Sequence, residues 1–570
     1  MSTARRDAVN AVVLSLGGAL WSLRFALGPD RVLGNWRHPD VLSNHWLLEW
    51  VAERLATGQS LLHNDAYYWP VGDAPLLAGN GMEGFPYAPF AWALDWPMSV
   101  TAFAVALLTF NGLAAYGLAR AAGAAAAGGW LAAMAVAAHP YPATELSMGH
   151  FPQADLGWMM LSLAALLRFD DTGRTGWGLA AGLAGGVCAL LYWYHGVFLG
   201  IAAVVLTLGR PLRWPGVLAG LAGAAAVAGP WLAVSLTHIE AVPGFQEATF
   251  PAVEATEATL LLDWPVGALG PWQQGRVWPL AVALLAPLGI RRGGWRWAAL
   301  AALAFGLGLG GALYEAAYGW AALLRRFWWP YRHGALWLIA GAVLAARGVS
   351  VLPARRWAGL LLGLTLPWML TRTGDARPVR ASPATLPPAA AEALAALPDG
   401  LVIEPPLSPR SSSSQVPLIE QRFHHKPLLT GHAPWVERVR PRAWDEAMAA
   451  NPFLAGLQRW ERGGAGDIPI EGLDALRTEG AVYLVVNPGL FAQALAAQPD
   501  GYHILGEALG REVARERGVV IYALDRAPPP TVALPPVRWP GGLKPAGPRH
   551  PLNGLGFPDA TFDQVLGAPR

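Results

Sequence analysis

RHPDVLSNHWLLEWVAERLATGQSLLHNDAYYWPVGDAP, residues 37–75, is a polar stretch that comes directly after the first strongly apolar segment, Ala8–Leu27. Its ionisable residues include Asp40, His45, Glu49, His63, Asp65 and Asp73. Ionisable side chains are rare at membrane depth, so a stretch that carries many of them between apolar helices belongs at the water boundary. We therefore expect residues 37–75 to form the floor of a functional site at the membrane surface.

The composition of the whole chain is that of a membrane protein. Charged residues make up 14% of the 570 residues, against about a quarter in soluble domains, while apolar residues make up 54%. A chain of this length holds about ten spans of ~20 residues together with a separate domain of ~100–200 residues. The formal net charge is +2 and no basic run stands out, which excludes nucleic acid as an expected partner.

Apolar runs long enough to cross a bilayer predict about eleven spans. The runs are 8–27, 98–119, 124–138, 153–168, 175–192, 195–209, 214–235, 275–290, 295–313, 333–347 and 355–372. No small-x-small cleavage site follows the first run, so we expect an uncleaved span rather than a signal peptide. Arginines occupy every second connection, which places the N-terminus in the cytoplasm and the long acid- and aromatic-rich loops outside. Residues 76–97 are apolar but broken by prolines and glycines, and we expect them to be interfacial or re-entrant; if they span with a partner segment, the count becomes about thirteen.

The composition changes after Thr373. Residues 374–398 read as a Pro/Ala-rich linker that ends in a short helix. Strand-like runs at 401–407, 481–487 and 519–525, with helix-like stretches 442–460 and 490–498 between them, predict a small α/β domain outside the membrane. The expected division is a transmembrane domain 1–373 with a first external loop 28–97, the linker 374–398, the α/β domain 399–526 and an extended or poorly ordered Pro/Gly-rich tail 527–570. The single cysteine, Cys188, excludes a disulfide within the chain.

Asp40 is the candidate catalytic residue of the first loop. It follows the first span closely, and a carboxylate at that depth can take a proton from an acceptor hydroxyl or amine. Alternatively, Asp40 caps a helix over 41–56, because Asp is a favoured N-cap, and the spacing by itself favours this interpretation. Glu49 and Glu53 lie one turn apart on that helix beside Arg54, a pattern that favours solvated salt bridges.

The stretch HPYPATELSMGHFPQAD, residues 139–155, places Glu145, His150 and Gln153 just before a span. Polar groups at this depth indicate a site, whereas the alternative is that His150 and Gln153 form only the interfacial first turn of the helix. The sequence contains no metal-binding spacing such as HExxH. A divalent cation shared by Asp40, Glu145 and His150 nevertheless remains possible.

The stretch LLRRFWWPYRHGALW, residues 323–337, puts Arg326, Arg332 and His333 on the external face, where arginine is otherwise sparse. Guanidinium groups match phosphate geometry, so these residues are candidates to bind a lipid phosphate. The neighbouring aromatic residues are equally typical of an interface belt.

Several of these motifs together resemble bacterial GT-C-type membrane glycosyltransferases, the relatives of protein mannosyltransferases and aminoarabinose transferases. They are the early Asp40 in HPD, the YWPVGD segment, GHFPQ around His150 and Gln153, RFWWPYRH before a late span, and HHKPLLTGH with AVYLVVNPG in the C-terminal part. Many enzymes of this class have paired acids in the first loop, whereas Asp40 here lies between Pro39 and Val41.

The resemblance implies a GT-C fold and the transfer of a sugar from a polyprenyl-phosphate-linked donor to an extracytoplasmic acceptor. It implies that Asp40 is the general base and that Arg326 and Arg332 hold the phosphate. His150, Gln153, His333, Glu49 and Asp73 are further candidates for substrate contact. The implied location is the bacterial inner membrane with the C-terminal domain outside. The alternative is a non-catalytic membrane protein that binds or transports a lipid-linked glycan.

Overall fold

The computed structural model describes residues 2–34, 40–73, 81–211, 213–238, 280–308, 311–318, 330–353, 379, 381–383, 389–405, 407, 416–430, 441–461, 466–478, 480–487, 499–516, 518–527 and 530–535. The chain divides into two compact units. The first consists of Met1–Gly34, Phe90–Leu236 and Thr249–Ser382, and the second of Asn35–Pro89, Thr237–Ala248 and Pro383–Arg570. α4 (Gly84–Ala93) runs across one of these divisions and contains Pro89.

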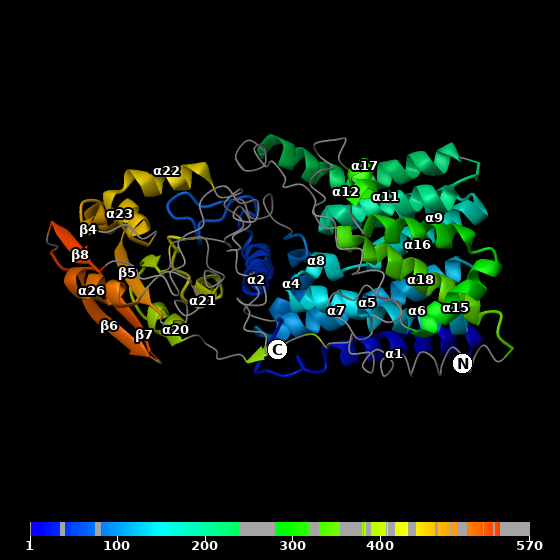
Figure 1. Cartoon of the computed structure of the whole chain (residues 1–570), viewed down its shortest axis with the longest axis horizontal. Helices are drawn as coiled ribbons and strands as arrows, with labels where there is room; N and C mark the ends of the chain where they lie inside the picture. The colour runs from blue at the N-terminus through cyan, green and yellow to red at the C-terminus, as the bar shows by residue number, and fades with distance from the viewer. Residues whose placement is uncertain are drawn as a thin grey trace. The chain divides into compact units, whose positions relative to one another are not determined.

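The first unit is a bundle of apolar helices (Figure 1). Its elements are α1 (Thr3–Leu23), β1 (Arg31–Leu33), α5 (Met98–Ala121), α6 (Ala126–Ala137), α7 (Pro140–Ser147), α8 (Phe151–Ala154), α9 (Gly157–Thr172), α10 (Thr175–Leu191), α11 (Trp193–Thr207), α12 (Trp214–His238), α15 (Leu280–Arg291), α16 (Trp295–Gly308), α17 (Gly311–Tyr318), the 3₁₀ turn η4 (Pro330–His333), α18 (Gly334–Val349) and β2 (Ala381–Pro383). Each apolar run expected up to 333–347 coincides with a helix, while the last run, 355–372, lies outside the described residues.

Within the part of the chain that the structure describes, two helices, α5 and α12, are long and apolar enough to cross a membrane by length and composition. The pair α16 and α17 would count as a third if it forms one span bent by 102°. The remaining apolar helices are shorter, among them α10, α11, α15 and α18. The count of about eleven spans therefore remains a prediction.

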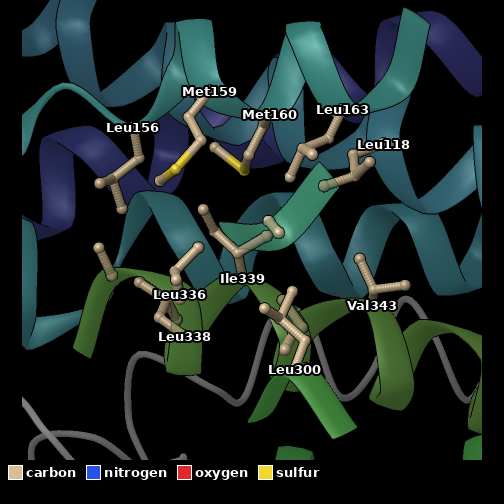
Figure 2. Packing of buried hydrophobic residues seen from close by; sticks show 14 of the residues in the cluster. Leu118, Leu156, Met159, Met160, Leu163, Leu300, Leu336, Leu338, Ile339 and Val343 are labelled. Carbon is tan, nitrogen blue, oxygen red and sulfur yellow. The ribbon is translucent and has the colours of Figure 1, made fainter. Parts of the chain in front are cut away.

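The core of this bundle is built around α18. Leu336, Ile339 and Val343 of α18 pack among methionine and leucine side chains of neighbouring helices (Figure 2). Glycines let the backbones approach closely: a Cβ atom added at Gly128 of α6 would lie 2.1 Å from the Ala346 carbonyl oxygen. Lipid supplies no hydrophobic drive between helices, so such close backbone packing is the main source of their association.

Arginines at the ends of the helices bind backbone carbonyl groups. Arg347 donates to the carbonyls of Ala122 and Arg292, while Arg292 donates to that of Ser350 at 3.1 Å. Arg296 donates twice to the carbonyl of Leu208, at 2.9 and 3.1 Å. The last carbonyls of a helix have no partner within it, so these arginines satisfy groups that would otherwise be unpaired.

The second unit is built on a four-stranded sheet of order β3–β5–β7–β6, in which β3 and β5 are parallel and the other pairs antiparallel. Its elements are α2 (Val41–Thr57), α20 (Ala389–Ala395), β3 (Gly400–Ile403), α21 (Val416–His424), α22 (Arg442–Ala450), α23 (Pro452–Glu461), β4 (Gly466–Pro469), α24 (Leu473–Arg477), β5 (Ala481–Val486), α26 (Pro499–Leu509), β6 (Arg511–Glu516), β7 (Val519–Ala523) and β8 (Thr531–Leu534). α26 packs against β5, β6 and β7 (Figure 1).

The three strand-like runs of the sequence are strands β3, β5 and β7. The stretch 442–460 is two helices, α22 and α23, rather than one, while 490–498 lies outside the described residues. At the start of the expected tail, β8 pairs with β4 as an antiparallel strand.

Residues 35–89 belong to the second unit, although the sequence analysis expected them in the transmembrane domain as part of its first external loop. The physical reason is that α2 is buried on nearly all sides from Val41 to Ala52 and packs against α21 of the C-terminal part. An amphipathic pattern shows that a helix has a partner, but not which segment provides it.

Candidate functional site

Asp40 lies at the N-terminus of α2, as expected. Its backbone carbonyl accepts from the Asn44 amide at 3.0 Å and from the Ser43 hydroxyl at 3.1 Å, which begins the helix. Its side chain makes no capping hydrogen bond and is only 6% exposed. The capping interpretation therefore explains the position of the residue but not what its carboxylate does.

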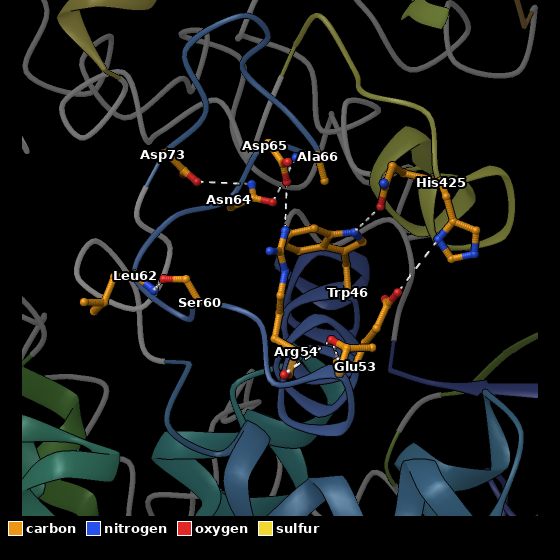
Figure 3. Close-up of polar contacts among 12 residues, drawn as sticks. Trp46, Glu53, Arg54, Ser60, Leu62, Asn64, Asp65, Ala66, Asp73 and His425 are labelled. Carbon is orange, nitrogen blue, oxygen red and sulfur yellow. Dashed lines mark hydrogen bonds and ion pairs between the residues drawn. The ribbon is translucent and has the colours of Figure 1, made fainter. Parts of the chain in front are cut away.

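Glu49 is not a solvated salt-bridging residue, so that expectation is wrong. Its side chain is buried, pairs with the Arg422 guanidinium at 2.7 Å and accepts a hydrogen bond from the Tyr87 hydroxyl. Glu53, one turn later, is exposed and lies 4.0 Å from His425 (Figure 3). The helix pattern correctly placed the two carboxylates on one face, but α21 covers only the first of them.

Asp73 closes the loop that follows α2. Backbone hydrogen bonds of 2.8 and 2.9 Å join it to Asn64, and the Asn64 side-chain amide donates to its carboxylate at 3.2 Å (Figure 3). Burial raises the pKa of Asp73 to about 7, and the nearby polar groups of Tyr67 and Asn64 partly oppose the shift. These contacts hold the loop together, and they leave a substrate-binding role for Asp73 as a prediction.

In the first unit, Glu145, His150 and Gln153 lie together around α7 and α8. His150 Nδ1 lies 2.8 Å from the buried Glu145 carboxylate, and the His150 amide donates to the Glu145 carbonyl at 2.8 Å. Gln153 is 4% exposed, and its side-chain oxygen has no hydrogen-bond partner among the described residues. The described part of the chain holds no group of three or more residues suited to a metal ion, so the Asp40–Glu145–His150 cation site gains no support.

Arg332 lies at the end of η4 and is 8% exposed. It donates to the Tyr192 hydroxyl, and its guanidinium carbon lies 5.0 Å from the ring centre of Tyr194 and 5.5 Å from that of Tyr192. The two tyrosine rings are themselves stacked 5.0 Å apart. Arg332 is therefore a buried cation held against aromatic faces. Arg326 lies outside the described residues.

His333, next to Arg332, is a packed residue of the bundle. Its Nδ1 donates to the Pro330 carbonyl at 2.9 Å, because a carbonyl only accepts, so its Nε2 accepts from the Tyr318 hydroxyl at 2.7 Å. The ring also lies 4.4 Å from that of Phe198. Both ring nitrogens have partners within the protein, so His333 supports η4, and a substrate-binding role for it stays a prediction.

Sequence reasoning missed Tyr192, Tyr194 and His195. All three come from YWYHG, residues 192–196, at the join of α10 and α11, where the expected spans 175–192 and 195–209 meet. The clustering of aromatic residues and a histidine in so short a connection was the available signal. The Tyr192 and His195 rings lie 4.9 Å apart and both residues are buried.

No family model matches the sequence, and no curated protein matches it. Among solved structures, the chain is similar to ArnT from Cupriavidus metallidurans bound to undecaprenyl phosphate, with 14% identity, a TM-score of 0.46, and coverage of 91% of this chain and 97% of that chain. It is similar to the Archaeoglobus fulgidus oligosaccharyltransferase in complex with Zn and sulfate, with 15% identity, a TM-score of 0.39, and coverage of 75% of this chain but only 62% of that chain.

A further similar structure is the archaeal oligosaccharyltransferase AglB from Archaeoglobus fulgidus in complex with an inhibitory peptide and a dolichol-phosphate. The identity is 13% and the TM-score 0.41, over 92% of this chain and 76% of that chain.

Proposed function

We propose that the protein is a GT-C-type glycosyltransferase that moves a sugar from a polyprenyl-phosphate-linked donor to an extracytoplasmic acceptor. The observation that carries the proposal is the burial of Arg332 against Tyr192 and Tyr194 in an apolar bundle. A guanidinium held against aromatic faces inside an apolar bundle is a fixed positive charge, which favours an anionic ligand. A lipid phosphate is a partner that an apolar bundle can receive from the membrane.

The chemistry of Arg332 favours phosphate over a carboxylate or a metal. A guanidinium has five N–H donors in a planar fork, of which Tyr192 accepts from one. The fork fits two phosphate oxygens at once, and the stacked tyrosines fix its plane. Arg326, six residues earlier in the chain, is proposed as the second phosphate ligand.

The proposed reaction is a single inverting displacement at the anomeric carbon. The acceptor oxygen or nitrogen forms a bond to that carbon as the bond from the carbon to the phosphate oxygen breaks. Asp40 takes the proton of the acceptor, and the polyprenyl phosphate leaves with the electron pair of the broken bond. The Arg332 guanidinium stabilises the charge that develops on the phosphate.

Gln153 is proposed to contact the sugar. The buried amide oxygen of Gln153, which meets no hydrogen-bond partner among the described residues, is an acceptor that a sugar hydroxyl can satisfy. The neighbouring His150–Glu145 pair fixes the turn between α7 and α8 and thereby the entry of Gln153 into α8.

Binding of undecaprenyl phosphate to the full-length protein tests the phosphate assignment. Arg332→Gln is expected to weaken binding by about tenfold to a hundredfold, since a hydrogen bond to a charged group contributes about 1.5–3 kcal/mol. Arg291→Gln is the matched control, because Arg291 is an exposed arginine at the end of α15 in the same unit. Equal affinity of wild type and Arg332→Gln, measured by native mass spectrometry in nanodiscs, would remove the proposed phosphate site.

The alternative, a protein that binds or transports a lipid-linked glycan without catalysis, shares the Arg332 prediction. It differs in Asp40, which it does not need. The measurement that separates the two functions is the release of undecaprenyl phosphate from a panel of undecaprenyl-phosphate sugars, by the wild type and by Asp40→Asn. Release by the wild type that is lost in Asp40→Asn supports the glycosyltransferase, and no release by the wild type supports the non-catalytic alternative.

A further inference from the structure

Helix α2 is joined to helix α21 by a buried set of polar contacts. Trp46 of α2 is 1% exposed, and its indole N–H donates to the Gln421 side-chain oxygen at 3.0 Å (Figure 3). One turn later, Glu49 pairs with Arg422 at 2.7 Å. The two residues of α2 are spaced i and i+3 and so share a face, and their partners are adjacent in α21.

Glu49 is held from two sides. One carboxylate oxygen accepts from the Tyr87 hydroxyl and the other pairs with Arg422. These two contacts hold the Glu49 side chain in one orientation. They thereby fix the rotation of α2 about its own axis and the position of α2 along the axis of α21. Apolar packing alone does not fix these two quantities as sharply, since hydrophobic attraction is non-directional.

A second link joins the loop after α2 to the central sheet. The Val402 amide of β3 donates to the Pro427 carbonyl and the Leu429 amide donates to Val402, both at 2.9 Å. On its other side, the same short segment bonds to the loop: the Leu428 amide donates to Ala66 at 2.9 Å and the Trp69 amide donates to Leu428 at 3.2 Å. Residues 427–429 thus connect the edge strand β3 to the loop that follows α2.

We propose that Gln421 and Arg422 are positioning residues that set the place of Asp40 through α2. The proposal rests on the proposed function, in which Asp40 is the base. Asp40 precedes Trp46 by six residues of one helix, about 9 Å at ~1.5 Å per residue, so a helix fixed at Trp46 and Glu49 holds its N-terminus as a rigid unit. A misplacement of about 1 Å at a reacting group costs about a hundredfold in rate.

The test measures hydrogen–deuterium exchange of the full-length protein in nanodiscs and, in parallel, release of undecaprenyl phosphate from undecaprenyl-phosphate mannose and undecaprenyl-phosphate aminoarabinose. The variants are Arg422→Gln, Gln421→Leu and the conservative Arg422→Lys. The matched control is Arg515→Gln, because Arg515 lies in the same unit but pairs with Glu512 on the exposed strand β6.

In Arg422→Gln and Gln421→Leu, exchange over residues 41–52 is expected to rise at least about tenfold, while exchange in β5 and β7 stays at the wild-type level. The kcat for donor turnover is expected to fall by about a hundredfold. The pH dependence of turnover should be unchanged, because the base itself is still present. Arg422→Lys should restore part of both properties, and Arg515→Gln should change neither.

Unchanged exchange in α2 would overturn the proposal, whatever the enzyme does. It would also be overturned if α2 loosens without loss of turnover while Asp40→Asn is inactive. If Asp40→Asn turns over donor at the wild-type rate, Asp40 is not the base and the positioning role falls with it, although the exchange result still reports whether α21 holds α2.

Discussion

Asp40 is the residue on which the proposed chemistry depends. Asn is as good an N-cap as Asp, and the Asp40 side chain makes no capping hydrogen bond, so Asp40→Asn should leave α2 intact. The loss of a general base is expected to lower turnover about 10²- to 10⁴-fold. Turnover of the undecaprenyl-phosphate sugars by purified protein measures this, and thermal unfolding of the same sample verifies the fold. A wild-type rate would move the base elsewhere, with Glu49, Asp65 and Asp73 as the next candidates.

Glu404 and Glu420 predict a pH dependence of stability. Both carboxyls are buried in the second unit, Glu404 directly after β3 and Glu420 in α21. Burial, and then the charge of Glu420, raise the pKa of Glu404 well above its ordinary value, and burial also raises the pKa of Glu420. The folded state thus keeps protons that the unfolded chain releases near pH 4.5. The contribution of this pair to the stability is therefore largest below that pH and is lost as the pH rises through the raised pKa values.

Glu404→Gln should flatten this dependence, because an amide has about the same shape and does not titrate. The melting temperature of the variant should exceed that of the wild type at pH 8 and approach it at pH 5. Glu512→Gln serves as control, since Glu512 lies on the exposed strand β6 and pairs with Arg515. Parallel melting curves of wild type and Glu404→Gln across this range would show that the buried pair does not control the dependence.

The sequence singled out a residue correctly where its side-chain chemistry is unusual for the side of the membrane on which it is expected. Arg332 stood out because an arginine expected on the external face beside aromatics contradicts the general arginine trend, and its side chain is buried. Glu49 did not, because its partner Arg422 lies in a different part of the sequence and no local pattern reveals it. Tyr192 and Tyr194 were missed because a short connection between spans reads as a turn.

At the scale of elements, the contact between α10 and α12 depends on glycine. A Cβ atom at Gly182 would lie 1.8 Å from the Gly220 carbonyl oxygen, and one at Gly178 would lie 2.4 Å from that of Gly216. Gly182→Ala should therefore push α12 away from α10 and destabilise the protein by about 1–3 kcal/mol.

Gly200→Ala is the matched control for this contact, because a Cβ atom at Gly200 of α11 meets nothing within 4 Å. The melting temperature in nanodiscs measures both variants. Equal melting temperatures for Gly182→Ala and Gly200→Ala would show that α12 is not held by this close approach.

Elements were easier to predict than their ends. Long apolar runs give helices, but their ends can differ from the expected ones. The run 153–168 became α9 at Gly157–Thr172, because Asn111 hydrogen-bonds the backbone just before this helix. The Asn111 side chain donates to the Ala154 carbonyl at 2.7 Å and accepts from the Leu156 amide at 3.0 Å, which separates α8 from α9. Strand β6, with the sequence REVARE, was missed because an exposed edge strand lacks the apolar pattern of β3, β5 and β7.

For the whole molecule, the orientation in the membrane remains a prediction with a direct test. The arginine alternation places the N-terminus in the cytoplasm and everything after about residue 373 outside. Alkaline phosphatase fused after Asp399 should then be active and green fluorescent protein fused there dark, with the reverse at the N-terminus. Fluorescence from the Asp399 fusion would place the C-terminal unit in the cytoplasm, and it would contradict the proposal that the acceptor is extracytoplasmic.

The division of the molecule was the hardest property to predict from the sequence. Composition shifts mark where a chain changes from membrane to water, and Thr373 is such a point. Such shifts do not show that residues 35–89 join the C-terminal unit. That grouping depends on contacts between residues far apart in the sequence, such as the hydrogen bond from Trp46 to Gln421.

The separation of Trp46 and Gln421 by 375 residues also imposes an order of events on biosynthesis. A ribosome that adds ~5–20 residues per second needs roughly 20–75 s to reach α21 after it has made α2. During that time the face of α2 that contacts α21 is without that partner, while the helices between them are being made. A chain that ends before Val416 should therefore lack the contact that covers Trp46, even though most of the bundle has been translated.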